Sequence, residues 1–162
     1  MSVGSGDGAA DEGPRLEPGP ATDIHDVSGS IVAPGLIDLH THVYWGGTSL
    51  GIDAEEFCRT SGVTTAIDTG SAGPGNFAGF RRHVIEPSKV RILAYLHVSH
   101  AGIYAFSNRV MVGESEELRL MDPVSAVEVA NANRDVIVGI NNTRIADATE
   151  VARRAGQNEP TA

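Results

Sequence analysis

The chain has 162 residues, a formal net charge of −9 and hydrophobic side chains at 41% of its positions. That length is enough for one domain with its own hydrophobic core. The acidic balance argues against nucleic acid and against an anionic membrane surface as partners, because both need a basic protein face. With one cysteine and no signal-peptide pattern at residues 1–10, the expectation is a cytoplasmic protein without a disulfide.

The first part of the chain has a different composition from the rest. Residues 1–22 are rich in Gly, Pro, Asp and Glu and have almost no apolar side chains, which predicts a disordered leader. Apolar residues begin at Ile24, and the short pair Ile31-Val32 is stopped by Pro34-Gly35. A folded domain is therefore expected to begin near residue 34.

From residue 36 onward, strand-like and helix-like segments alternate. Apolar or β-branched runs predict four strands, at 36–43, 63–68, 90–98 and 136–140. Periodic segments between and after them predict four helices, at 53–60, 77–85, 123–133 and 146–155. Asp53 and Asp122 are expected helix N-caps, and Gly62 is expected to end the first helix. Residues 157–162 are predicted to be a polar tail.

This alternation predicts a parallel sheet whose strands are joined by helical crossovers. The units recur about every 30 residues, the size of one βα module. Four such units over residues 34–156 would form half of an eight-stranded barrel. A small open doubly wound sheet is the alternative, and hydrophobic periodicity alone does not separate the two folds.

The segment Asp38-Leu39-His40-Thr41-His42 carries the chemistry. Side chains alternate across a strand, so Asp38, His40 and His42 are expected on one face. Two imidazoles about 7 Å apart along a strand can converge on one metal ion, and Asp38 could orient one of the rings. The alternative is two polar residues on an exposed strand. The apolar strand before the pair and the glycine-rich loop after it favour the metal site.

The stretch from Val32 to Val43 resembles the first-strand signature of the amidohydrolase superfamily, a family of metal-dependent hydrolases. The sequence over residues 44–51 and 61–96 resembles its dihydroorotase-like deacetylase branch. The resemblance covers roughly residues 26–140. It implies an α/β fold, the first four βα units of a (β/α)8 TIM-type barrel. It also implies that residues 23–33 are a remnant of the β-sandwich that accompanies this barrel.

The resemblance further implies one or two divalent metals, usually zinc, bound at the mouth of the barrel. Of the family's ligands only His40 and His42 match residues of this sequence. Asn141 stands in the position of the family's carboxylated lysine, and an amide cannot be carboxylated. The one lysine, Lys89, is expected at the opposite end of the barrel. Strands five to eight, with two further histidines and a catalytic aspartate, are expected to be missing, so the chain is expected to be truncated.

Other polar residues are weaker candidates. His97, near the end of the third strand, could share a face with Ser99 and reach a metal, whereas His100 falls on another face. Asp68 ends the second strand above a glycine-rich loop, where a structural βα turn is favoured over a phosphate site. Cys58 is interpreted as a buried small hydrophobic residue.

Three functions remain open from the sequence. The first is hydrolysis of a small-molecule amide, cyclic or N-acyl, by descent. The second is a non-catalytic fragment that binds a metal or a partner through an open sheet edge, with self-association expected. The third is one piece of a split enzyme completed by a separate chain. Asn141 favours the second hypothesis over the first.

Overall fold

The computed structural model describes residues 25–111, 115 and 117–142, in two units that divide at Pro34. The predicted leader at 1–22, the helix at 146–155 and the tail at 157–162 lie outside the described residues. In the first unit, residues 27–30 form a turn in which the Ser30 amide donates to the Val27 carbonyl, 2.9 Å away. Residues 25–35 form no strand, and a β-sandwich remnant at 23–33 stays a prediction.

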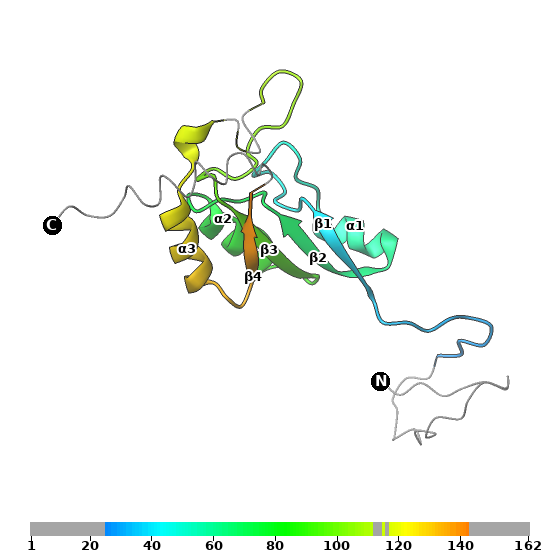
Figure 1. Ribbon diagram of the computed structural model, residues 1–162. Coiled ribbons are helices and arrows are strands. Elements are labelled where there is room, and N and C mark those ends of the chain that lie inside the picture. The colour runs from blue at the N-terminus through cyan, green and yellow to red at the C-terminus, as the bar shows by residue number, and fades with distance from the viewer. Residues whose placement is uncertain (1–24, 112–114, 116, 143–162) are drawn as a thin grey trace. The chain divides into compact units, whose positions relative to one another are not determined.

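The second unit is built on one parallel sheet, shown in Figure 1. Its strands are β1 (Leu36–Thr41), β2 (Val63–Thr69), β3 (Arg91–His97) and β4 (Ile137–Asn141). They follow one another in the order β1-β2-β3-β4, and each neighbouring pair is parallel. All four predicted strands are confirmed. A doubly wound sheet reverses its strand order at a switch point, so this sequential order favours the barrel unit instead.

The helices lie where capping signals and periodicity predict them. They are α1 (Ala54–Ser61), α2 (Phe77–Phe80), which continues as the π-helical turn η1 (Arg81–Ile85), and α3 (Pro123–Ala132). Asp53 caps α1 by accepting a hydrogen bond from the Glu56 amide at 2.9 Å, and Gly62 ends that helix with φ of 74°. Asp122 likewise accepts from the Ser125 amide at 3.0 Å. The short 3-10 turn η2 (Leu118–Leu120) was not predicted.

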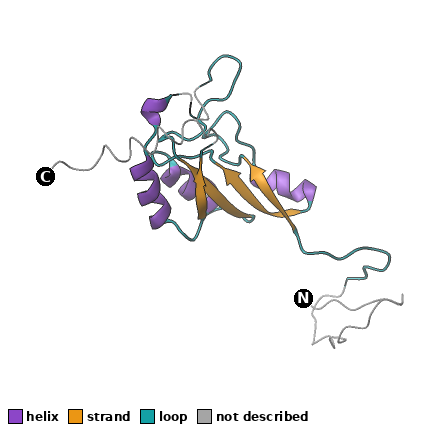
Figure 2. Ribbon diagram, viewed as in Figure 1, coloured by secondary structure: helices purple, strands orange, loops and turns teal. Residues whose placement is uncertain are grey.

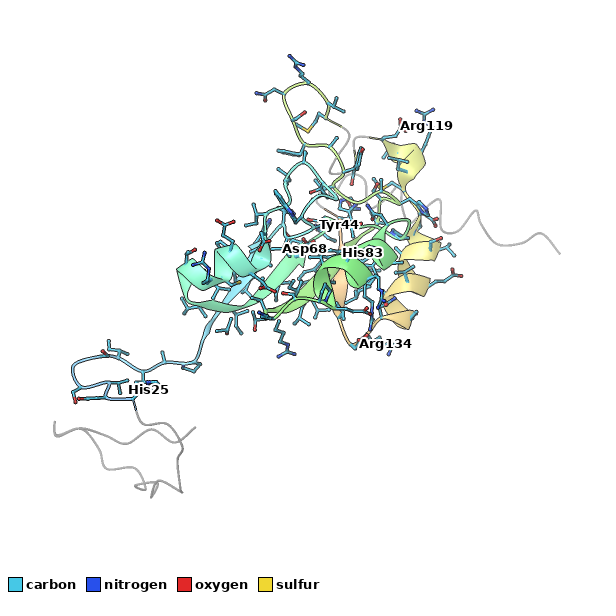
Figure 3. The ribbon with its side chains drawn as sticks, turned by 180° about the vertical axis from the view of Figure 1, so that it is seen from behind. His25, Tyr44, Asp68, His83, Arg119 and Arg134 are labelled. Atoms are coloured by element: carbon cyan, nitrogen blue, oxygen red, sulfur yellow. The ribbon has the colours of Figure 1, made fainter. Side chains whose placement is uncertain are left out.

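The helices cover one face of the sheet. In Figure 1 the strands stand in front of α1 and α2, and in the opposite view of Figure 3 these helices stand in front of the sheet. Phe77 and Phe80 are fully buried in the resulting core, and each such side chain contributes about 1.5–3 kcal/mol of burial free energy. The sheet contributes the small and branched side chains of this core, among them Ala66, Ile92, Ala94, Leu96 and Ile137.

Several large apolar side chains on the strands remain exposed. Leu39 on β1 exposes 68% of its surface and Val138 on β4 exposes 49%. Tyr95 lies across Gly139, where an added Cβ would come within 2.7 Å of the tyrosine ring. The sheet is therefore packed on its helical side and has uncovered apolar groups elsewhere. None of the described helices is long and apolar enough to cross a bilayer.

Candidate metal centre

The predicted site lies at the carboxyl ends of the strands. Because all four strands are parallel, the loops that follow them meet at one edge of the sheet, the upper edge in Figure 2. Backbone hydrogen bonds join these loops: the His97 amide donates to the Ala72 carbonyl at 2.9 Å, and the Ile103 amide donates to the Gly70 carbonyl at 3.0 Å. This is the edge at which barrel enzymes build their active sites.

His40 and His42 lie next to each other at the end of β1. Their ring centroids are 5.6 Å apart and the ring planes are inclined by 81°. Thr41 between them is buried, and its hydroxyl donates to the Ile67 carbonyl at 3.0 Å. The imidazole of His40 is exposed and that of His42 is half-buried. The sequence predicted that these two rings lie close together, and the structure places them next to each other.

Asp38 does not share their face, which corrects the expectation from simple alternation. Asp38 pairs with Ala66, and Thr41 pairs with Asp68. Between these two pairs β1 advances by three residues, whereas β2 advances by two. This extra residue is a bulge, and a bulge shifts every later side chain to the other face. The carboxylate of Asp38 accepts from the His40 backbone amide at 2.9 Å.

The charge of Asp38 acts on the helical side of the sheet instead. Burial raises the pKa of the Cys58 thiol on α1, and the nearby charge of Asp38 raises it further. Cys58 is 5% exposed and belongs to the core, as predicted for a small hydrophobic residue. The charge of Asp38 is thus near enough to α1 to act on Cys58.

Asp68 and Ser71, at the end of β2, contact the histidine segment directly. The fully buried carboxylate of Asp68 accepts from the Val43 amide and from the Ser71 amide, each at 2.8 Å. The Ser71 hydroxyl lies 3.1 Å from Nδ1 of His42. Asp68 follows Ala66 by two residues on β2, so both side chains lie on the same face of the strand. An ionisable residue on this apolar face was the signal in the sequence for a buried carboxylate.

Burial raises the pKa of Asp68, and several partners oppose that rise. The opposing hydrogen bonds come from the Val43 amide and from the side chain and amide of Ser71, with a smaller contribution from the charge of His42. Both carboxylate oxygens accept N–H bonds, an arrangement that favours the ionised form. Through these two amide bonds Asp68 ties the loop after β1 to the loop after β2.

The other end of the same edge carries His97 and Asn141, which pair in register on β3 and β4. The Asn141 amide donates to the Thr69 carbonyl at 2.9 Å. Gly70 has φ of 96°, and a Cβ there would lie 2.7 Å from Nδ2 of Asn141 and 3.1 Å from the His97 ring. Lys89 precedes β3 and so lies at the opposite end of the strands, as predicted.

His97 is fully buried, and burial lowers its pKa to about 4. Its Nδ1 accepts from the Ser99 amide at 2.9 Å, so the neutral ring carries its hydrogen on Nε2. That Nε2 has no hydrogen-bond partner among the described residues. A buried donor without a partner costs about 1–3 kcal/mol.

The donor set fits a divalent metal in part. Neutral imidazoles are preferred zinc ligands, and the adjacent rings of His40 and His42 supply two. Catalytic zinc sites have three protein ligands as a rule. Within residues 25–111, 115 and 117–142, no three His, Cys, Asp or Glu side chains are grouped to hold an ion, so His97 does not complete the pair.

Comparison with known proteins gives two related sequences. The chain is 44% identical over 115 residues to a deacetylase of Brucella anthropi, covering 71% of this chain and 28% of that protein. It is 40% identical over 136 residues to a deacetylase of Agrobacterium fabrum, covering 83% of this chain and 33% of that one. The chain thus spans about a third or less of these curated relatives. No protein-family model matches it.

Two solved structures resemble the fold. A dihydroorotase superposes with a TM-score of 0.58 at 41% sequence identity, over 66% of this chain and 27% of that one. An adenine deaminase superposes with a TM-score of 0.59 at 24% identity, over 84% of this chain and 39% of that one. The second likeness shows the fold alone. Together they confirm the predicted fold class, a parallel sheet with alternating helices that is part of a TIM-type barrel.

Proposed function

Because the chain is related to the amidohydrolase superfamily, we propose that it supplies the first-strand ligands of a divalent-metal site for hydrolysis of a non-peptide C–N bond. The observation that carries this proposal is the imidazole pair of His40 and His42 at the carboxyl end of β1. Zinc is the metal proposed, because neutral imidazole is a good zinc ligand and because hydrolysis needs no change in the oxidation state of the metal. We propose a small-molecule amide, N-acyl or cyclic, as the substrate.

A bound divalent ion in such a site would polarise the amide carbonyl and lower the pKa of its bound water. His40 and His42 would hold that ion at the rim of the sheet. The exposure of His40 leaves that side of the pair open to solvent and to a small substrate. Relatives named deacetylase and dihydroorotase support the amide class of substrate.

We further propose that these 162 residues alone bind metal weakly and do not hydrolyse amides. Asn141 is a neutral amide already bonded to the Thr69 carbonyl, so it adds no charge at the place of the family's lysine. Among the described residues, no third His, Cys, Asp or Glu side chain is grouped with the imidazole pair to hold an ion. Amide hydrolysis needs a group that passes a proton to the leaving nitrogen as well as the metal-activated water.

Two measurements on the purified chain test this proposal. Calorimetric titration with zinc is expected to give a dissociation constant in the micromolar range or weaker, abolished by His42→Ala and unaffected by His83→Ala on the exposed side of η1. A nanomolar site that survives His40→Ala would refute the ligand assignment. Turnover of N-acetyl amino acids, dihydroorotate or hydantoins, lost with His42→Ala and with chelator, would refute the proposed inactivity.

A complementing chain, or a second copy, is the second candidate function. Among the described strands, β1 and β4 each pair on one side only, and apolar residues such as Leu39 and Val138 are exposed on them. Unpaired edges of this kind promote association. Sedimentation is expected to show oligomers, and a compact cooperative monomer would argue against this candidate. We also propose a cytoplasmic location, which the single cysteine supports.

A further inference from the structure

We propose that Asp68 and Ser71 are positioning residues that fix the ring orientation and the tautomer of His42. This inference rests on the proposed metal site, because it concerns how one of its two ligands is presented. The geometry that carries it is a continuous chain of contacts from the buried carboxylate, through the serine, to Nδ1 of the imidazole. Neither residue belongs to the segment that the sequence marked as the metal motif.

The first step is the anchoring of two loops by one carboxylate. Asp68 holds the Val43 amide, one residue beyond His42, with one oxygen. With the other oxygen it holds the Ser71 amide. Asp68 and Ser71 are both fully buried, so these bonds are shielded from water. The serine is thereby fixed relative to the backbone on which His42 stands.

The second step is the direction of the hydrogen bond at the ring. The Ser71 hydroxyl lies 3.1 Å from Nδ1 of His42, so this ring nitrogen faces the serine. A neutral imidazole binds a metal through the nitrogen that carries no hydrogen. Because Nδ1 faces Ser71, the proposed metal site uses Nε2. The ring is then expected to carry its hydrogen on Nδ1, and the Ser71 oxygen accepts that hydrogen.

The third step is the consequence for metal binding. A neutral imidazole with its hydrogen on Nδ1 keeps the lone pair of Nε2 for an ion. In metal sites, the partner of the second ring nitrogen fixes both orientation and tautomer, and its loss lowers affinity about 10–100-fold. The carboxylate of Asp38 bonds the backbone amide of His40, whereas the Ser71 hydroxyl contacts the His42 ring. The loop after β2, rather than β1 itself, prepares the ligand.

Nuclear magnetic resonance of the metal-free chain tests the tautomer directly. Long-range nitrogen–proton spectra of ¹⁵N-labelled protein are expected to show His42 protonated at Nδ1. Ser71→Ala is expected to shift His42 toward the tautomer protonated at Nε2, and Ser71→Thr, which keeps the hydroxyl, to preserve the original. Ser61→Ala, which removes a hydroxyl bonded to the Phe57 carbonyl on α1, is the matched control and should change neither ring.

Zinc titration of the same proteins supplies the second readout. Ser71→Ala is expected to weaken binding about tenfold, and Ser71→Thr to restore it. Wild-type His42 protonated at Nε2, or an unchanged tautomer in a folded Ser71→Ala protein, would overturn the inference. If Ser71→Ala fails to fold, the wild-type spectrum still decides. Failure of the wild type to bind zinc would refute the proposed function, whereas the spectrum of the metal-free protein would still test the tautomer.

Discussion

The two halves of the sheet's carboxyl edge differ in how their polar groups are satisfied. At the β1–β2 half, the described bonds of Asp68 and Ser71 converge on the His42 segment. At the β3–β4 half, the Nε2 of His97 is buried without a partner among the described residues, and Asn141 bonds a backbone carbonyl. The bonds of the first half hold the His42 segment, and the second half encloses a neutral ring and an amide.

This difference indicates which half of the edge orders the proposed metal site. A buried hydrogen-bond network that is fully satisfied fixes one geometry, whereas an unsatisfied donor costs free energy. The β1–β2 half therefore gives order to the proposed site. The β3–β4 half contributes structure, and the burial of its neutral imidazole lowers the pKa of that ring and makes this half sensitive to acid.

The largest expected effect comes from the loop that joins the two halves. A Cβ at Gly73 would overlap the Ser99 carbonyl oxygen and crowd the Gly102 amide nitrogen at 2.6 Å. Both obstacles are backbone, so neither can rotate away. Gly73→Ala is expected to abolish cooperative thermal unfolding, as monitored by circular dichroism. Gly79→Ala, whose Cβ would approach only the Tyr44 hydroxyl at 3.0 Å, should leave a cooperative transition. An equally stable Gly73→Ala protein would contradict this packing.

The next effect is acid sensitivity at the β3–β4 half. The pKa of His97 is lowered to about 4 by burial, against about 6.5 in the unfolded chain. The unfolded state therefore binds the extra proton between these values, and stability falls as the pH drops from about 6.5 to about 4. The loss attributable to this ring is about 3 kcal/mol.

Denaturant unfolding across this pH range measures that loss. A folded His97→Gln protein should show a shallower fall in its free energy of unfolding than the wild type. Replacing the exposed His83 of η1 by Gln should leave the slope as it is. If His97→Gln and wild type lose stability in parallel, the buried neutral ring is not the acid-sensitive group.

A smaller loss of stability is expected from Asp68→Asn at the β1–β2 half. The variant keeps one oxygen acceptor but replaces the other with an amide donor that cannot accept from a backbone N–H. One buried amide hydrogen is then unsatisfied, which costs about 1–3 kcal/mol. Urea unfolding at pH 7 should show this decrease, with Asp53→Asn at the exposed cap of α1 as the milder control. No change would mean that Asp68 does not bridge the two loops.

The smallest effect is expected at Asn141. Replacing it with lysine removes one hydrogen bond to the Thr69 carbonyl, which contributes about 1 kcal/mol. Asn141→Lys is expected to leave zinc affinity within about twofold and to create no amide hydrolysis, because no other donor is added beside His40 and His42. Turnover appearing with this single substitution would show that the rest of the site is present.

Much of the fold follows from local sequence signals. Strand alternation and helix capping depend on neighbours in sequence, as Asp53 and Glu56 show, so they were predictable. The bulge between Asp38 and Thr41 was not, because it is defined by the partner strand β2. For the same reason the contact between His42 and Ser71, 29 residues apart in sequence, was missed. The fourth predicted helix lies outside the described residues.

The most direct test of the central claim is the number of imidazoles that hold the metal. X-ray absorption spectra at the zinc edge, recorded on the chain loaded with one equivalent of zinc, give that number. Two imidazoles, with oxygen ligands completing the shell, are expected, and one imidazole is expected for His40→Ala. Three or more imidazoles, or a sulfur ligand from Cys58, would contradict a site in which only His40 and His42 bind.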